Sequence, residues 1–293
     1  MTASPAGFTS EHGVDDPFAP PPPPVALSIA GSDPSGGAGI QADLKTFSAL
    51  GAYGTTVITA LTAQNTRGVT GVHVVPPDFV AQQLDTLAED VRIDAIKIGM
   101  LATAELAGVV GEFLTQQARS ARPYVVLDPV MVATSGDRLL DESAVAAVRE
   151  LLPLADLVTP NVAEAAVLLD TEPARDLDAL AAQAHALVAA GARRVLAKGG
   201  HGMPDATDVL ADETAEAGAI VTFVGRRVDT QNTHGTGCSL SSALAAMRPQ
   251  RDSWPATIRD AKDWLTGALA AADTLDIGSG HGPVHHFYDV WSL

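Results

Sequence analysis

Residues 232–238, with the sequence Asn-Thr-His-Gly-Thr-Gly-Cys, combine two glycines with the only cysteine of the chain. The small residues that follow predict a helix over 236–247, so the glycines lie where a loop enters a helix. Unpaired N–H groups and the helix dipole favour negative charge at such a position. A thiol there can have a lowered pKa, which makes Cys238 a candidate base or nucleophile. A glycine-rich turn followed by a buried cysteine is the alternative.

Two carboxylates complement this anion site. Asp128 follows a predicted strand and Glu164 lies in a predicted helix, and both offer the oxygen ligands that Mg²⁺ prefers. With an anion-binding helix start they suit phosphoryl transfer, which depends on charge neutralisation and alignment. Each could instead be a solvated carboxylate or a helix cap. The P-loop motif, the Gly-x-Gly-x-x-Gly fingerprint and a zinc-ligand spacing are all absent from the sequence.

Alternating strands and helices must position these residues. Apolar runs predict strands over residues 25–30, 55–60, 95–98, 124–127, 156–158 and 194–197. Helical patterns lie between them, over residues 40–50, 77–89, 103–118, 141–151, 162–169 and 178–190, and the last two predicted helices are 236–247 and 254–275. Short strands at 208–210 and 220–223 predict an antiparallel edge. The pattern indicates an α/β fold in three layers, with a mostly parallel sheet covered on both faces.

Ligands of such a sheet bind beyond the carboxyl ends of its strands. Five predicted strands end in chemically useful residues, at positions 31–39, 99–100, 128, 159–161 and 198–200. Glycine-containing turns would occur at these places in any case. Their convergence on one edge nevertheless predicts a single site there.

The composition limits the class of protein. The 293 residues carry a net charge of −17, which argues against a nucleic-acid partner. No apolar run is long enough to span a membrane, and a single cysteine excludes an internal disulfide, so we expect a cytoplasmic protein. Residues 1–24 include five consecutive prolines and predict a disordered extension. Residues 25–293 would then form one domain.

Several sequence blocks, taken together, resemble one family. They are Ala-Gly-Ser-Asp-Pro-Ser-Gly-Gly-Ala-Gly-Ile-Gln-Ala-Asp at 30–43, Thr-Ala-Gln-Asn-Thr at 62–66, Lys-Ile-Gly-Met-Leu at 97–101, Thr-Pro-Asn at 159–161 with Glu164, Lys-Gly-Gly-His at 198–201, the segment 232–238, and Gly-Pro-Val-His-His-Phe at 282–287. The chain resembles the ribokinase-like superfamily in its hydroxymethylpyrimidine and phosphomethylpyrimidine kinase branch. The resemblance covers about residues 25–290. Many superfamily relatives have Asp where this chain has Cys238, which favours the pyrimidine and pyridoxal branches over sugar kinases.

The resemblance implies roles for particular residues. Gln64 would bind the aminopyrimidine edge through its amide. The pocket around the ring would be shaped by Gly31, Asp43, Met100 and Val130. Asp128 and Glu164 would hold Mg²⁺. The ATP phosphates would be bound by Asn161, Lys198, Thr233 and the amides of Gly235, Thr236 and Gly237. Cys238 would deprotonate the attacking hydroxyl.

The resemblance therefore implies an ATP- and Mg²⁺-dependent kinase of thiamine biosynthesis. Its small-molecule substrates would be 4-amino-5-hydroxymethyl-2-methylpyrimidine and the corresponding monophosphate, and we expect a homodimer. Pyridoxal kinase is a rival of the same fold, although the segment around Gln64 favours the pyrimidine. A hydrolase using Cys238 and His234 is a rival of another class, but nothing in the sequence supplies the third, orienting group. A non-catalytic binder of small molecules is a third alternative.

Overall fold

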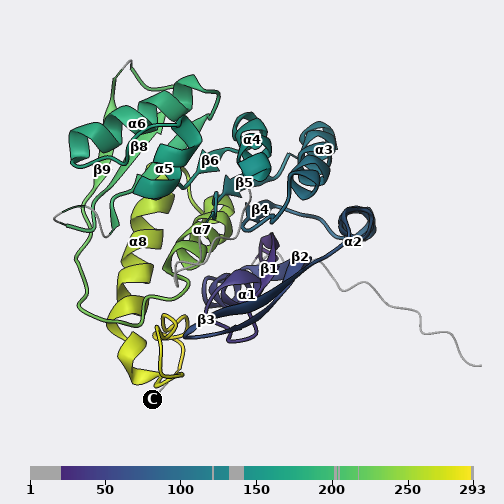
Figure 1. Ribbon diagram of the computed structural model, residues 1–293, viewed down its shortest axis with the longest axis horizontal. Helices are drawn as coiled ribbons and strands as arrows, with labels where there is room; N and C mark the ends of the chain where they lie inside the picture. The colour runs from purple at the N-terminus through teal and green to yellow at the C-terminus, as the bar shows by residue number, and fades with distance from the viewer. Residues whose placement is uncertain are drawn as a thin grey trace, which may run out of the picture.

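The computed structural model describes residues 21–120, 122–131, 142–200, 203, 205–216 and 218–291. Within these residues strands and helices alternate along most of the chain, as the apolar runs predict (Figure 1). The strands are β1 Val25–Ser32, β2 Tyr53–Asn65, β3 Gly68–Val74, β4 Ala95–Ile98, β5 Tyr124–Leu127, β6 Leu157–Val158, β7 Arg194–Lys198, β8 Asp208–Asp212 and β9 Ile220–Phe223. The helices are α1 Gly39–Ala49, α2 Pro77–Asp90, α3 Ala104–Ser120, α4 Glu142–Leu151, α5 Val162–Leu169, α6 Leu177–Ala189, α7 Thr236–Met247 and α8 Trp254–Ala270.

The described strands form one sheet in the order β3-β2-β1-β4-β5-β6-β7-β8-β9. All neighbours from β2 to β7 are parallel, and β8 and β9 continue the sheet antiparallel. The direction of strand addition reverses between β1 and β4. In open α/β sheets ligands bind at such a switch point, beyond the carboxyl ends of the strands.

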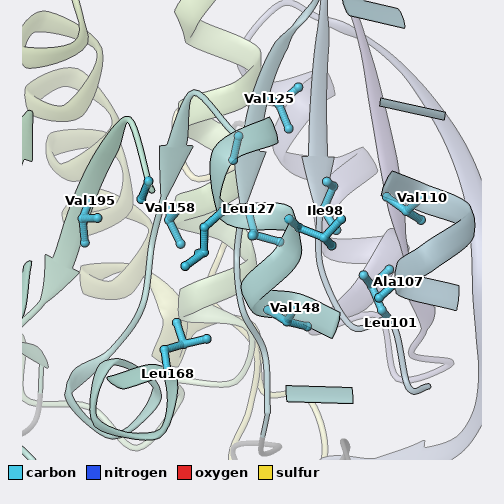
Figure 2. Packing of buried hydrophobic residues seen from close by; sticks show 14 of the residues in the cluster. Ile98, Leu101, Ala107, Val110, Val125, Leu127, Val148, Val158, Leu168 and Val195 are labelled. Atoms are coloured by element: carbon cyan, nitrogen blue, oxygen red, sulfur yellow. The ribbon is translucent and has the colours of Figure 1, made fainter. Parts of the chain in front are cut away.

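One face of the sheet is covered by α2 to α6. In Figure 2 the strand residues Ile98, Leu127 and Val158 lie among helix residues such as Val148 and Leu168. Ile98, Leu127 and Val158 are at most 1% exposed. Burying an aliphatic side chain of this size contributes about 1.5–3 kcal/mol, so this layer anchors the strands whose ends carry the candidate site.

The opposite face is covered by α1, α7 and α8 (Figure 1). Helix α7 packs against β1, β4 and β5, and residues 239–247 of it are buried. Its serines and alanines allow close approach to the sheet. Ser241 donates a hydrogen bond to Asp128, directly beyond β5, at an oxygen–oxygen distance of 3.1 Å. The first turn of α7 therefore lies at the same edge as the strand ends.

The three-layer α/β/α architecture with an antiparallel edge is confirmed, but two predicted boundaries are wrong. Strand β2 extends to Asn65, beyond the predicted 55–60, because its second half pairs antiparallel with β3, which was not predicted. Strand β3 is largely exposed and contains Gly68 and Gly71, so it lacks the alternating apolar face that identifies a strand. Helix α8 ends at Ala270, before the predicted 275, and a short 3-10 turn follows it.

Three further expectations fall wholly or partly on undescribed residues. Most of the proposed extension, residues 1–20, lies outside the described residues, as do Asp141 of the predicted helix 141–151 and His201 of the block 198–201.

No helix among the described residues is long and apolar enough to cross a membrane.

Candidate active site

A cavity of about 760 Å³ lies along the carboxyl edge of the sheet, from the end of β2 to β8. All predicted site residues except Asp43 line it. They lie at or just beyond the carboxyl ends of β1, β4, β5, β6 and β7, in the second half of β2, and in or beside the first turns of α5 and α7. The predicted convergence of strand ends on one site is thus present in the structure.

Two glycine loops meet at the start of α7. Gly235 caps the helix with a left-handed φ of 76°. A Cβ atom on it would lie 1.7 Å from the carbonyl oxygen of Gly37, in the loop that leads into α1. Gly237 faces Lys198 and Asp128, since a Cβ there would lie 3.4 Å from Lys198 Nζ and 3.8 Å from Asp128 Oδ2. Glycine therefore allows the loops to touch and leaves the helix N-terminus open to an anion.

Asp33 and His234 join these two loops. Asp33 Oδ1 accepts hydrogen bonds from the N–H and hydroxyl of Ser35, and Oδ2 accepts one from the N–H of Ala38. His234 Nε2 lies 2.7 Å from the same Oδ2 atom. Asp33 thus occupies Nε2 of the ring, which leaves only Nδ1 to face a thiol. The described residues contain no hydrogen bond between Cys238 and His234, so the geometry does not support the hydrolase.

The expected lowering of the Cys238 pKa is wrong. Burial raises the pKa of the thiol, and the carboxylates of Asp43 and Asp128 add to this effect. The ammonium group of Lys97 and a hydrogen bond from the backbone of Gly39 act in the opposite direction but do not reverse it. Cys238 is therefore a thiol in its resting form.

A buried ion pair lies beneath the cavity. Lys97 Nζ is 2.8 and 2.9 Å from the two oxygens of Asp43, and both residues are 0% exposed. Ser28 and Ser242 donate to the same carboxylate at 2.5 and 2.6 Å. Asp43 thus lies below the cavity wall and holds Lys97. Lys97 has no predicted role of its own, although a lysine inside an apolar strand is itself a signal of a buried partner.

Asp128 and Lys198 form a second pair, in the middle of the cavity. Lys198 Nζ donates to Asp128 Oδ1 at 2.9 Å, and Thr159 Oγ1 donates to the same atom at 3.1 Å. Asp128 is 1% exposed. Burial alone would raise the pKa of Asp128, but Lys198 and Lys97 hold it below its usual range. The carboxylate is therefore ionised and available to a cation.

Glu164 serves as a helix cap and also lines the cavity. Its carboxylate accepts a hydrogen bond from the Asn161 N–H at 2.8 Å, while Asn161 Oδ1 accepts one from the Glu164 N–H at 2.9 Å. This reciprocal capping box starts α5. Burial, with the charge of Asp128 adding to it, raises the pKa of Glu164 to about 7. A cation between the two carboxylates would relieve that repulsion.

The donor set fits Mg²⁺. The described residues contain no group of three or more His, Cys, Asp or Glu side chains arranged as a metal cage. Mg²⁺ does not need one, because it commonly binds one or two carboxylates and completes its shell with phosphates and water. Asp128 and Glu164 supply the two carboxylates.

Gln64 lies at the β2 end of the cavity. Its Oε1 lies 3.0 Å from Thr62 Oγ1, and its Nε2 lies 3.4 Å from His234 Nε2. Met100 forms an apolar wall nearby, where a Cβ on Gly31 would lie 2.5 Å from Met100 Cε. The absence of a side chain at Gly31 therefore leaves room for Met100. A small heterocycle with polar edges suits this combination.

The opposite end of the cavity includes residues that no sequence pattern predicts. Asp208 Oδ2 lies 2.5 Å from Lys262 Nζ, and Asp208 Oδ1 accepts the Gly199 N–H at 3.0 Å. Lys262 belongs to α8, and Leu265 and Thr266 of the same helix also line the wall. No motif marked them, because an amphipathic helix shows only which face is buried and not which cavity it borders.

Comparison with known proteins places these observations in a family. A family model described as Phosphomethylpyrimidine kinase matches residues 33–285. A hydroxymethylpyrimidine/phosphomethylpyrimidine kinase of Salmonella typhimurium is 56% identical over 269 residues, covering 91% of this chain and 98% of that protein. A pyridoxal kinase of Bacillus subtilis, solved as an ADP complex, is 32% identical with a TM-score of 0.82, covering 92% of this chain and 99% of that one. A phosphomethylpyrimidine kinase of Clostridium difficile is 35% identical with a TM-score of 0.72, covering 84% and 99%.

Proposed function

The chain belongs to the phosphomethylpyrimidine kinase family, and from this we propose that it phosphorylates 4-amino-5-hydroxymethyl-2-methylpyrimidine and then the resulting monophosphate, in thiamine biosynthesis. The observation that carries the proposal is the single cavity in which Gln64, the first turn of α7 and Lys198 all lie. It can hold an acceptor ring at one end and a nucleotide at the other, with an anion-binding helix start between them.

The acceptor ring binds at the β2 end. The Gln64 amide offers both a donor and an acceptor to the aminopyrimidine edge. Gly31, Met100 and Val130 border the same space and enclose the ring. Asp43 does not contact the ring. It lies below the cavity wall and holds Lys97 in place through their ion pair.

The phosphates of ATP bind in the middle of the cavity. Lys198 and the amides of Gly235 to Gly237 neutralise and align them, with Thr233 and Asn161 at the border. Asp128 and Glu164 hold Mg²⁺, which when bound supplies charge neutralisation for the transferred phosphoryl group. The adenosine portion extends toward Lys262 and Leu265 of α8.

Cys238 assists the attack of the acceptor hydroxyl. The substrate oxygen forms a bond to the γ-phosphorus while the bond to the ADP oxygen breaks, and the hydroxyl proton moves to Sγ. The thiolate that accepts this proton is a minor form at neutral pH, because burial raises the pKa of Cys238. Lys97 stabilises that form.

Pyridoxal is a second candidate acceptor, because a pyridoxal kinase shares the fold with a TM-score of 0.82. The higher identity to the Salmonella enzyme favours the pyrimidine. A coupled ADP-release assay with the pyrimidine, its monophosphate and pyridoxal tests both. We expect turnover of the first two and much slower turnover of pyridoxal. ADP release that depends on pyridoxal alone would contradict the pyrimidine assignment.

We further propose a cytoplasmic homodimer. Exposed apolar side chains on β2 and β3 support self-association, among them Leu61 and Val72, which are 46% and 49% exposed. Light scattering on the eluted protein should give twice the chain mass, and charged replacements of Leu61 and Val72 should reduce it to that of the monomer. If the wild type and the charged variant had the same mass, this surface would not be the dimer interface.

A further inference from the structure

The contact between Asp33 and His234 extends to Gln64. Three groups besides His234 donate hydrogen bonds to the Asp33 carboxylate, namely the N–H and hydroxyl of Ser35 and the N–H of Ala38. Burial opposes ionisation, but the hydrogen bonds from His234 and Ser35 hold the pKa of Asp33 below its usual range. An ionised carboxylate can only accept. His234 Nε2, 2.7 Å from Asp33 Oδ2, must therefore carry a proton and donate.

This donor constrains the Gln64 amide. His234 Nε2 lies 3.4 Å from the amide group of Gln64. If the amide nitrogen faced His234, N–H groups would oppose one another. The amide oxygen on that side can instead accept the longer branch of a three-centre hydrogen bond, in which the single Nε2–H points mainly at Asp33 Oδ2.

Thr62 leads independently to the same orientation. Its hydroxyl lies 2.8 Å from the carbonyl oxygen of Ser32, which can only accept. The hydroxyl has one proton, and donation to Ser32 uses it. At 3.0 Å from the Gln64 amide, the hydroxyl must then accept, and its partner must be the amide nitrogen. Oxygen and nitrogen of an amide have nearly the same shape, so only the hydrogen-bond network distinguishes them.

We propose that Asp33 and His234 are positioning residues that fix the Gln64 amide, with its oxygen toward His234 and its nitrogen toward Thr62, and so determine how the acceptor ring is read. This rests on the proposed function of the cavity. One amide hydrogen and one lone pair of Gln64 remain for the substrate. Their order across the cavity is then set before binding, which favours a ring with a matching donor–acceptor edge.

Steady-state kinetics test the chain of contacts. His234→Ala should raise the KM for the pyrimidine by about tenfold, with the KM for ATP within about twofold of the wild-type value. His234→Gln places an N–H donor near the Nε2 position and should restore most of the affinity. Gln64→Ala should raise the pyrimidine KM by at least about tenfold, and adding His234→Ala to it should cause little further change. Independent, multiplying effects of the two substitutions would show that His234 does not act through Gln64.

Asp33→Asn and Ser35→Ala form a matched pair that does not alter His234 itself. Asp33→Asn replaces an acceptor with an amide and should reproduce the KM increase of His234→Ala. Ser35→Ala removes one hydroxyl donor to Oδ1 but keeps the Ser35 N–H bond to that atom and the contact of Oδ2 with His234, so the pyrimidine KM should stay within about twofold of the wild-type value. Thermal melting separates these effects from loss of folding. Equal KM values for Asp33→Asn and the wild type would overturn the proposal.

A measurement without substrate separates this inference from the proposed function. Ring ¹⁵N shifts of the histidine-labelled protein report which nitrogen is protonated, and His234→Gln identifies the His234 signals. We expect a protonated Nε2 in the wild type and in Ser35→Ala, and a changed pattern in Asp33→Asn. An unprotonated Nε2 in the wild type would refute the inference, even in an active kinase. Failure to phosphorylate the pyrimidine with Nε2 protonated would refute only the proposed function.

Discussion

Cys238 lies close to both carboxylates and a lysine. Burial and the carboxylates of Asp43 and Asp128 raise the pKa of its thiol, and Lys97 limits the rise. Because Asp43 holds Lys97 at two oxygens, the cation has a fixed position below the cavity. Such an arrangement keeps the thiol protonated at rest while placing a counter-charge near the thiolate.

The two phosphorylations should differ in their need for Cys238. In the first step a neutral hydroxyl attacks, and a positioned base accelerates this by about 10²–10⁴-fold. In the second step the attacking phosphate oxygen is already ionised at neutral pH, since its second pKa is about 6. Cys238→Ala should thus reduce kcat/KM severely for the alcohol and mildly for the monophosphate. Equal losses would indicate that Cys238 only shapes the loop.

The raised pKa of the Cys238 thiol predicts how the rate of the first phosphorylation depends on pH. Below a raised thiol pKa, the thiolate fraction grows about tenfold per pH unit. For the wild type, kcat/KM of the alcohol step should therefore increase between pH 7 and 9, and in Cys238→Ala it should not. A flat wild-type profile would argue against a proton transfer to Cys238.

Single residues of the site differ in how well the sequence reveals them. Cys238 and Asp128 could be predicted because a helix start and a strand end are visible in the pattern of apolar residues. The position of Lys198 at a strand end is visible in the same way, and the family resemblance added Gln64. The roles of Asp43 and Lys97 could not be assigned correctly, because a carboxylate of α1 and a lysine of β4 meet only through the packing of α1 on the sheet.

At the level of elements, the start of α7 depends on one backbone conformation. Gly235 has a φ of 76°, and a Cβ there would lie 1.7 Å from the carbonyl oxygen of Gly37. Gly235→Ala should therefore displace the two glycine loops and reduce kcat/KM by about 10²-fold or more. It should also destabilise the fold, since the left-handed conformation alone costs about 1–2 kcal/mol.

Gly51 provides the matched control. Its φ is 72°, but a Cβ added there meets nothing within 4 Å. Gly51→Ala isolates the cost of the left-handed conformation, with activity unchanged. Urea unfolding and the coupled assay on both variants separate the two contributions. Similar activity in both would show that contact between the loops is unnecessary for catalysis.

The helices and strands were largely predictable where one buried face makes apolar residues recur at a regular spacing along the sequence. Strands β1, β4 and β5 and the helices over them have apolar faces, and their predicted positions agree with the structure to within two residues at nearly every end. Strand β3 has no such face, and the pairing of Gln64 with Val69 depends on the turn at Thr66 and Arg67. Edge strands of this kind are specified by their partner strand and the turn rather than by their own pattern.

For the molecule as a whole, we propose that the folded domain begins close to the last proline of the N-terminal run. Removal of residues 1–20 should leave the melting temperature and activity nearly unchanged, because that composition buries too little apolar surface to offset ordering entropy. Pro24 differs, since its carbonyl accepts the Tyr53 N–H at 2.8 Å. Removal of residues 1–24 should therefore cost about 0.5–1.5 kcal/mol in unfolding free energy. A large loss of activity after removal of 1–20 would show that the segment packs on the fold.

Acid stability tests how the C-terminal segment is joined to the rest of the molecule. His286 is 3% exposed, and its Nε2 lies 3.0 Å from the hydroxyl of Ser239 in α7. Burial, with Lys45 and His285 adding to it, lowers the pKa of His286 to about 3. A histidine in the unfolded chain has a pKa of about 6.5, so unfolding at lower pH is accompanied by proton uptake. The contribution of neutral His286 is complete above pH 6.5 and is lost as the pH falls toward 3.

The size of this loss can be measured by urea unfolding. Each pH unit below 6.5 should remove up to about 1.4 kcal/mol, so the wild type should lose about 1 kcal/mol more than His286→Gln between pH 7.5 and 5.5. His286→Gln will lower the stability at pH 7.5, but the informative quantity is the difference between the two pH values, because it cancels the cost of altered packing. His73→Gln, a change at an exposed position of β3, should leave the difference as in the wild type. Equal pH differences in the wild type and His286→Gln would mean that His286 titrates normally in the folded protein, and that the link to α7 through Ser239 remains when the ring is charged.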